Sequence, residues 1–244
     1  MTKKLLLRCF NEKRITMAKE NQENVDKGMQ NIESALSKTE HYIEDNRNTV
    51  IYIILGIIAL VAIYFAFKRF YVAPKEKEAE SSIFMAQRYF EQDSFKLALD
   101  GDGANVGLLE IINSYGITKT ANLACYQAGI SFLKLGEYEE AIKYLKKFSG
   151  KDKMVAPIAI AAIGDAELEL GQDKEAASSY VKAAGMNENS FTTPIFLMKA
   201  GEAYERSGEP DKALKVYQQL KKDYPNSSEG SQVDKYITRI QLKK

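Results

Sequence analysis

The stretch GISFLKLGEYEEAIKYLKKF, residues 129–148, decides the fold because two later stretches repeat its pattern. GDAELELGQDKEAASSYVKA begins at Gly164, and GEAYERSGEPDKALKVYQQL begins at Gly201. In each stretch a small residue starts one helical segment, a glycine ends it, and an alanine lies on the next segment. The glycines that end the segments recur at intervals of 35 and 37 residues, as Gly136, Gly171 and Gly208. A fixed period of this length predicts stacked helical repeats.

The residue types in the pattern suit pairs of antiparallel helices. A small residue allows two helices to approach closely, and Ala141, Ala176 and Ala213 recur at that position. A glycine can adopt the left-handed conformation that ends a helix. We expect large side chains to fill the space between pairs, namely Phe132, Tyr144, Tyr180, Tyr204 and Tyr217. The pattern resembles the tetratricopeptide repeat (TPR), whose unit is about 34 residues.

An earlier and weaker unit is predicted in AQRYFEQDSFKLAL, residues 86–99. It has matching residues at the same relative positions, namely Ala86, Tyr89, Asp93, Phe95 and Ala98. The predicted fold is therefore all-α, a TPR-like α-solenoid over residues 75–244. Its units lie near 76–119, 122–155, 157–190 and 194–227. A capping helix over 229–242 follows, with an apolar stripe of Val233, Tyr236, Ile237 and Ile240.

The segment DGDGAN, residues 100–105, lengthens the first unit and resembles the start of a calcium loop. A calcium-binding EF-hand needs oxygen ligands at positions 1, 3 and 5, glycine at 6 and glutamate at 12. Ala104, Asn105 and Ile111 stand at the last three of these positions. We therefore favour a structural insertion, in which Gly101 or Gly103 ends one helix and Asn105 caps the next. A loop that contacts a partner is the remaining alternative.

TVIYIILGIIALVAIYFAF, residues 49–67, carries no charge and is long enough to cross a bilayer as a helix. Tyrosine and phenylalanine lie near its ends, and Lys68 and Arg69 follow it. The sequence predicts a transmembrane helix over 49–71. It begins too far from Met1 to be a signal peptide.

The polar tail, residues 1–48, has a narrow apolar stripe of Val25, Met29, Ile32, Leu36 and Ile43. We expect a helix there, which lies on a membrane, on a partner or in solvent. Met17 offers a second translation start, which leaves open whether residues 1–16 are part of the protein. Local charge, with Lys68, Arg69, Lys75 and Lys77 after the apolar segment, favours a cytoplasmic repeat domain. The nine cations of the whole tail favour the opposite orientation.

Composition argues against several functions. The 34 basic and 33 acidic residues give a net charge of +1, which does not favour nucleic-acid binding. The single histidine, His41, cannot supply a histidine-rich metal site or a catalytic triad. Cys9 and Cys125 lie on either side of the apolar segment, so we expect no disulfide between them, and Cys125 to be a buried apolar residue. We expect no enzyme activity, no cofactor, no bound metal and no small-molecule substrate.

The chain has a polar tail, an apolar anchor and a basic stop, followed by AESSIFMAQRYFEQDSFKLAL and by repeats that close with YPNSS. This layout resembles the YfgM-type ancillary subunit of the bacterial SecYEG translocon. That resemblance implies a bacterial inner-membrane protein with a cytoplasmic N-terminus and a periplasmic repeat domain. It also implies partners among translocon subunits, an envelope chaperone or a client polypeptide. The alternative function is a cytoplasmic adaptor of a membrane signalling or assembly complex.

A TPR groove is lined by the first helix of each pair. TPR domains that clamp a peptide carboxylate use lysine and asparagine on this face. Tyr126 and Ile130 stand at such positions here, so we expect no carboxylate clamp. The predicted protein-binding groove is apolar at its start and acidic toward its end. Its residues are Leu123, Tyr126, Ile130, Leu133, Ile158, Ala161, Asp165, Leu168, Ile195, Met198, Glu202 and Glu205.

Overall fold

The computed structural model describes residues 46–150 and 152–242. These residues divide between two compact units, and the boundary lies between Phe67 and Lys68. In the first unit, helix α2 spans Arg47–Phe67 and contains the whole uncharged segment. The side chains of residues 51–67 are all exposed. Among the described residues, α2 is the one segment that is long and apolar enough to cross a membrane, judged by length and composition. The helix expected in the tail, residues 1–16 and Cys9 lie outside the described residues.

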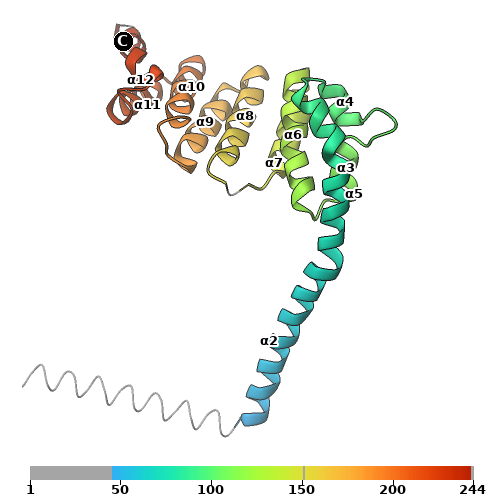
Figure 1. The fold of residues 1–244 in the computed structure, drawn as a ribbon. Coiled ribbons are helices and arrows are strands. Elements are labelled where there is room, and N and C mark those ends of the chain that lie inside the picture. Colours follow the sequence, from blue (N-terminus) through green and yellow to red (C-terminus); the bar gives the residue numbers. More distant parts are fainter. Residues whose placement is uncertain (1–45, 151, 243–244) are drawn as a thin grey trace, which may run out of the picture. The chain divides into compact units, whose positions relative to one another are not determined.

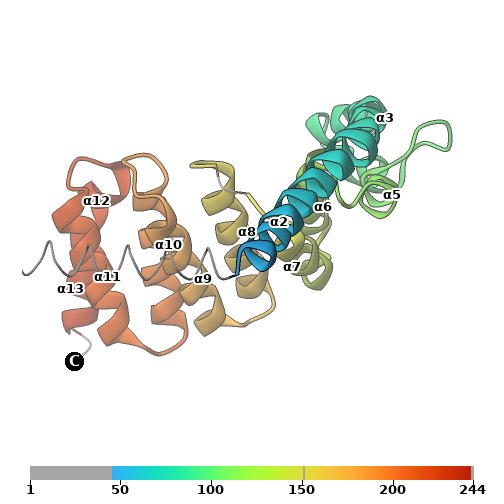
Figure 2. The ribbon, with the colours of Figure 1, turned by 90° about the horizontal axis from the view of Figure 1, so that it is seen from below.

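The second unit is an array of helices that stand side by side in chain order (Figures 1 and 2). It begins with a π-helical turn, η1 (Lys68–Val72), and α3 (Ala73–Glu91), which packs with the short α4 (Phe95–Asp100). Three helix pairs follow: α6 (Lys119–Leu135) with α7 (Tyr138–Lys147), α8 (Val155–Glu169) with α9 (Asp173–Met186), and α10 (Thr193–Arg206) with α11 (Pro210–Asp223). Helices α12 (Ser228–Gln232) and α13 (Asp234–Leu242) close the array. This is the predicted all-helical solenoid.

The turns inside the pairs use the left-handed conformation that the sequence pattern predicts. Gly136, Gly171 and Gly208 have φ angles of 80°, 73° and 74°. Asp93 holds the corresponding place between α3 and α4, with a φ of 56°. The first pair therefore repeats the backbone geometry of the others although it has no glycine at this turn.

A second glycine in each of the last three pairs sits where the two helices touch. A Cβ built on Gly129 would lie 2.5 Å from Leu145 Cγ, and one on Gly164 would lie 2.9 Å from Tyr180 Cε1. A Cβ on Gly201 would overlap the ring of Tyr217, which is fully buried. The missing side chain on the first helix therefore makes room for a large one on the second.

Gly201→Ala should lower the free energy of unfolding by about 1–2 kcal/mol. Overpacking against Tyr217 costs roughly 1–3 kcal/mol, and the better helix propensity of alanine returns about 0.5–1 kcal/mol. Gly185→Ala is the matched control, because Gly185 is in α9 and an added Cβ would meet nothing within 4 Å. Urea denaturation should show a loss for the first variant and no loss for the second; equal stabilities would contradict the close contact.

The core is rich in alanine at the helix crossings. Ala141, Ala176 and Ala213 are all fully buried. Of the large side chains expected between pairs, Phe132, Tyr180 and Tyr217 are buried, while Tyr144 and Tyr204 are partly buried. In the closing helices, the sides that the sequence pattern predicts to be apolar face the array: Val233 and Ile240 are buried, and Tyr236 and Ile237 pack against the same cluster.

Helix α6 is capped from another helix as well as from its own chain. Thr118 Oγ1 accepts a hydrogen bond from the Ala121 amide at 3.0 Å. The carboxylate of Glu76 on α3 accepts from the amides of Lys119 and Thr120 at 2.7 and 3.0 Å, and from the Thr120 hydroxyl at 2.8 Å. Burial alone would raise the pKa of Glu76, but these hydrogen bonds lower it below its ordinary value. The starts of α3 and α6 are thereby held together.

The DGDGAN segment forms a closed loop between α4 and α5 (Leu108–Ser114). Gly101 ends α4 as expected, with a φ of 84°. The expectation that Asn105 caps the next helix is wrong, because α5 begins after Gly107 and has no side-chain cap. Asn105 instead donates its amide and side chain to Asp102, and Tyr89 donates its hydroxyl to the same carboxylate at 2.7 Å. These hydrogen bonds lower the pKa of Asp102, with the bond from Tyr89 contributing most.

Calcium should not bind this loop, because neighbouring donors already occupy the oxygens of Asp102. We expect isothermal titration with millimolar calcium to give no saturable heat, and the melting temperature to stay constant. A calcium-dependent rise in melting temperature that disappears in Asp102→Ala would contradict this assignment, since a ligand that binds the native state stabilises it.

Candidate functional site

The first helices of the last three pairs carry the predicted groove residues, and these residues differ in how much surface they offer. Leu123 and Glu202 are exposed, Ala161 is buried at 4% exposure, and the rest are partly buried. The apolar members pack against the core, which limits the surface that they present. These are Tyr126, Ile130, Leu133, Ile158, Leu168, Ile195 and Met198. The two remaining acids, Asp165 and Glu205, both accept hydrogen bonds.

Part of the predicted groove on α6 lies against the chain that follows α7. The ring of Phe148 lies 5.4 Å from the ring of Tyr126, measured between centroids. Asn122 holds the segment in place, because its Oδ1 accepts from the Ser149 amide at 2.8 Å and its Nδ2 donates to the Ser149 carbonyl at 3.3 Å. The ring of Tyr126 is therefore covered on one side, whereas Leu123 stays exposed on the same helix.

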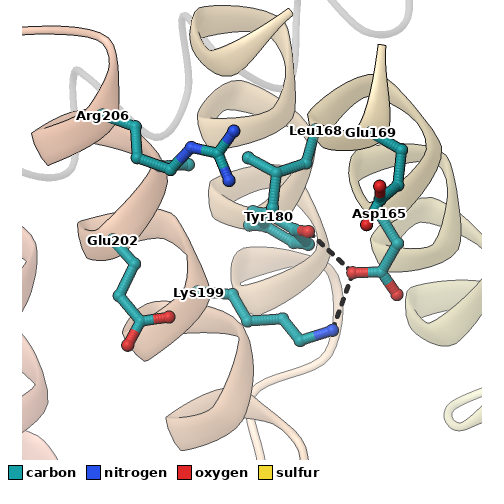
Figure 3. A pocket seen from close by; sticks show the side chains of 8 residues that line it. Asp165, Leu168, Glu169, Tyr180, Lys199, Glu202 and Arg206 are labelled. Atoms are coloured by element: carbon teal, nitrogen blue, oxygen red, sulfur yellow. Dashed lines mark hydrogen bonds and ion pairs between the residues drawn. The ribbon is translucent and has the colours of Figure 1, made fainter. Parts of the chain in front are cut away.

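A pocket of about 330 Å³ opens between α8 and α10, with α9 at its base (Figure 3). Asp165, Leu168 and Glu169 project from α8, and Lys199, Glu202 and Arg206 project from α10. Tyr180 of α9 lies between the two sets. The structure therefore brings together three of the predicted groove residues, Asp165, Leu168 and Glu202, in one hollow.

Asp165 organises one side of the pocket. Its Oδ1 accepts a hydrogen bond from the Tyr180 hydroxyl at 2.6 Å and from Lys199 Nζ at 2.7 Å. Burial raises the pKa of Tyr180, and the hydrogen bond to Asp165 raises it further, so the hydroxyl stays protonated and continues to donate. Asp165 and Lys199 thus form a fixed wall that joins α8 to the next repeat.

The other cation of the pocket is also paired. Arg206 Nε lies 3.0 Å from Asp173 Oδ1 at the start of α9. Glu169 and Glu202, in contrast, have no ion-pair or hydrogen-bond partner within residues 46–150 and 152–242. With both cations engaged by other acids, the pocket offers two carboxylates to a ligand. Its electrostatics suit a positively charged group above the apolar side chain of Leu168.

A similar arrangement of acid, tyrosine and base recurs at the end of the array. Glu205 Oε1 accepts from the Tyr217 hydroxyl at 2.9 Å and from Arg239 Nη2 of α13 at 2.6 Å. Lys199 follows Asp165 by 34 residues, and Arg239 follows Glu205 by the same interval. Helix α13 therefore completes the last repeat electrostatically as well as by packing.

Sequence reasoning missed five residues of the pocket: Glu169, Tyr180 as a donor, Lys199, Ala203 and Arg206. A signal existed for the two cations. Ile195, Lys199, Glu202 and Arg206 follow the helical spacing of a single face of α10. Only the acids of this face were included in the predicted groove, so the ion pair in which Lys199 neutralises Asp165 was not foreseen. Among the described residues, no group of three or more His, Cys, Asp or Glu side chains is placed to hold a metal ion.

Comparison with known proteins agrees with this architecture. Two family models described as tetratricopeptide repeat match the chain, one over residues 126–191 and one over residues 196–227. No curated protein matches the chain. Both matched segments contribute side chains to the pocket, α8 and α9 from the first and α10 from the second. The chain therefore carries tetratricopeptide repeats, and its pocket lies between the first helices of two neighbouring repeats.

Proposed function

We propose that this protein is a membrane-anchored scaffold that binds a segment of another protein in the pocket between α8 and α10. The observation that carries the proposal is the pair of open carboxylates, Glu169 and Glu202, beside Leu168 in a hollow on tetratricopeptide repeats. Stacked repeats form extended concave binding surfaces. A lysine or arginine of the bound segment would pair with the carboxylates, and its aliphatic stem would cover Leu168.

Helix α2 serves as the anchor in this proposal. Its 21 residues rise about 32 Å, close to the thickness of the hydrocarbon core. Residues 51–67 contain no charged side chain. An intramembrane charge usually marks an ion or proton path, so this helix has the composition of an anchor rather than of a transporter. The repeats would then carry the binding function.

The finer proposal places the repeats in the periplasm of a bacterium, next to the SecYEG translocon and envelope chaperones. Its support is the resemblance in layout to the YfgM-type subunit. A cytoplasmic adaptor is the second candidate, and one observation favours it. The four cations Lys68, Arg69, Lys75 and Lys77 directly follow the apolar segment, where the positive-inside rule expects the cytoplasm.

Cysteine accessibility separates the two candidates. In a Cys9→Ser, Cys125→Ser background, a cysteine is placed at exposed Gln172 or at Glu23 in the tail. The periplasmic arrangement predicts that a membrane-impermeant maleimide added to intact cells with permeabilised outer membranes labels position 172 and not position 23. The reverse pattern would reject the periplasmic arrangement and favour the adaptor.

Photo-crosslinking in native membranes tests the binding site. A benzoylphenylalanine at Arg206, at the pocket, should give discrete adducts with other proteins, whereas one at exposed Gln219 on α11 should not. Mass spectrometry of the adducts identifies the partner. Equal adducts from both positions would contradict the pocket as the binding site. Adducts without translocon subunits or chaperones would keep the scaffold and remove the translocon assignment.

A further inference from the structure

Each turn that leads into a first helix of the last three pairs exposes one large apolar side chain. Ile117 precedes α6, Met154 precedes α8 and Phe191 precedes α10. Their exposed fractions are 53%, 43% and 71%. The three residues are 37 positions apart in sequence, so the feature recurs with the repeat. An apolar residue before a helix often packs onto its first turn, but the exposure of Ile117 and Phe191 shows that this packing is incomplete here.

In the turns before α8 and α10, a side chain accepts hydrogen bonds from backbone amides. Asp152 Oδ1 accepts from the amides of Met154 and Val155 at 2.8 and 2.5 Å. Asn189 Oδ1 accepts from the amides of Phe191 and Thr192 at 2.9 and 2.8 Å. Met154 and Phe191 are thus presented on backbone that is hydrogen-bonded to a neighbouring side chain.

The three turns lie along one edge of the second unit, and that edge also contains the start of α3 (Figure 1). Along this edge, hydrogen bonds link each segment to the next. Glu76 of α3 binds the Lys119 amide, Asn122 binds Ser149, and Asn187 Nδ2 donates to the Lys153 carbonyl at 2.8 Å. The chain enters the unit at this same edge, because Lys68, the first residue of the unit, lines one hollow together with Ile117 and Lys119.

We propose that this edge, defined by Ile117, Met154 and Phe191, lies in the interfacial layer of the membrane that α2 crosses. The proposal rests on the membrane anchor of the proposed function. It assigns a lipid surface, rather than a protein, to the edge because the chain is tethered to the bilayer there. Tethering raises the effective concentration of the edge at the surface, so three side chains are enough to hold it. Interfacial contacts of this kind combine apolar insertion with nearby cations.

The charges on the edge agree with a lipid surface of modest negative charge. Lys68, Arg69, Lys77, Lys119 and Lys153 are exposed there. The carboxylates of Glu76 and Asp152 are turned to backbone amides. The exposed carboxylates of Glu80 and Glu188 offset part of this positive charge. The apolar side chains therefore carry the contact, and anionic lipid strengthens it only slightly.

Fluorescence quenching in lipid nanodiscs tests the proposal on the full chain, with no other membrane protein present. In a Cys9→Ser, Cys125→Ala background, an environment-sensitive dye is attached through Ser190→Cys, which is exposed beside Phe191. The matched control is Gln172→Cys in the turn after α8, at the opposite edge, about 22 Å away along that helix. A headgroup spin label should quench the dye at 190 and leave the dye at 172 unchanged.

Two further variants decide between outcomes. Ile117→Ser, Met154→Ser and Phe191→Ser together should abolish quenching at 190 while circular dichroism keeps its helical signal. Leu60→Cys, in α2, reports the anchor through an acyl-chain spin label. Quenching at 60 without quenching at 190 would overturn the edge contact and leave the anchor intact. Absence of quenching at 60 would overturn both. Quenching at 190 that survives the triple change, or that occurs only with phosphatidylglycerol, would also overturn the assignment to the apolar residues.

Discussion

Replacing Ala213 by leucine should lower the free energy of unfolding by about 3 kcal/mol, at the upper end of what overpacking costs. Ala213 is fully buried where α11 meets α10, and its cluster contains Ala200 and Ala203. The added isobutyl group has no space, so the helices must separate or neighbouring side chains must leave their preferred rotamers. Ala141→Leu and Ala176→Leu should have the same effect in the two preceding pairs, because both sites are also fully buried.

Gln218→Leu is the control for Ala213→Leu, because Gln218 is on the same helix and is exposed. Thermal and urea unfolding should show a large loss at position 213 and little change at position 218. If the melting temperature of all three alanine variants equalled that of the parent, the assigned register of the helix pairs would be wrong.

The pairing of helices could be read from sequence because it depends on residue types with few alternatives. A left-handed turn selects glycine, and a close crossing selects glycine or alanine, so Gly136, Gly171 and Gly208 reveal the period directly. Asp93 adopts the same conformation without being glycine. Its neighbours Ala86 and Ala98 are both fully buried, and they are what made the first pair recognisable.

The details of the site could not be read in the same way, because they depend on contacts between distant segments. Nothing local in sequence indicates that Phe148 covers Tyr126 or that Arg239 reaches Glu205. Polar loop residues also have several competing partners, and Asn105 binds Asp102 instead of capping α5. The twelve predicted groove residues were chosen by helical register. Register shows which residues share one face of a helix, but it does not show which acids on that face are already paired.

Glu169→Lys should reduce photo-crosslinking from position 206 by roughly tenfold or more, because placing like charges together opposes association. The change replaces one of the two open carboxylates with a cation, so a lysine or arginine of the partner would meet repulsion at that side of the pocket. Glu202→Lys should act in the same direction from α10. Glu169→Gln removes the charge without reversing it and should give a smaller loss.

Loss of fold cannot account for the expected effect of Glu169→Lys. Glu169 is exposed in the last turn of α8, where a cation interacts favourably with the helix dipole by about 0.3–1 kcal/mol. The variant should therefore melt no lower than the parent.

Asp223→Lys is the matched control, since it makes the same charge change at an exposed site in the last turn of α11, away from the pocket. Because the net charge changes equally, a general electrostatic effect would reduce the adducts in both variants. A reduction confined to Glu169→Lys and Glu202→Lys would locate the basic segment of the partner between α8 and α10, whereas undiminished adducts in those two variants would reject a cationic ligand for this pocket.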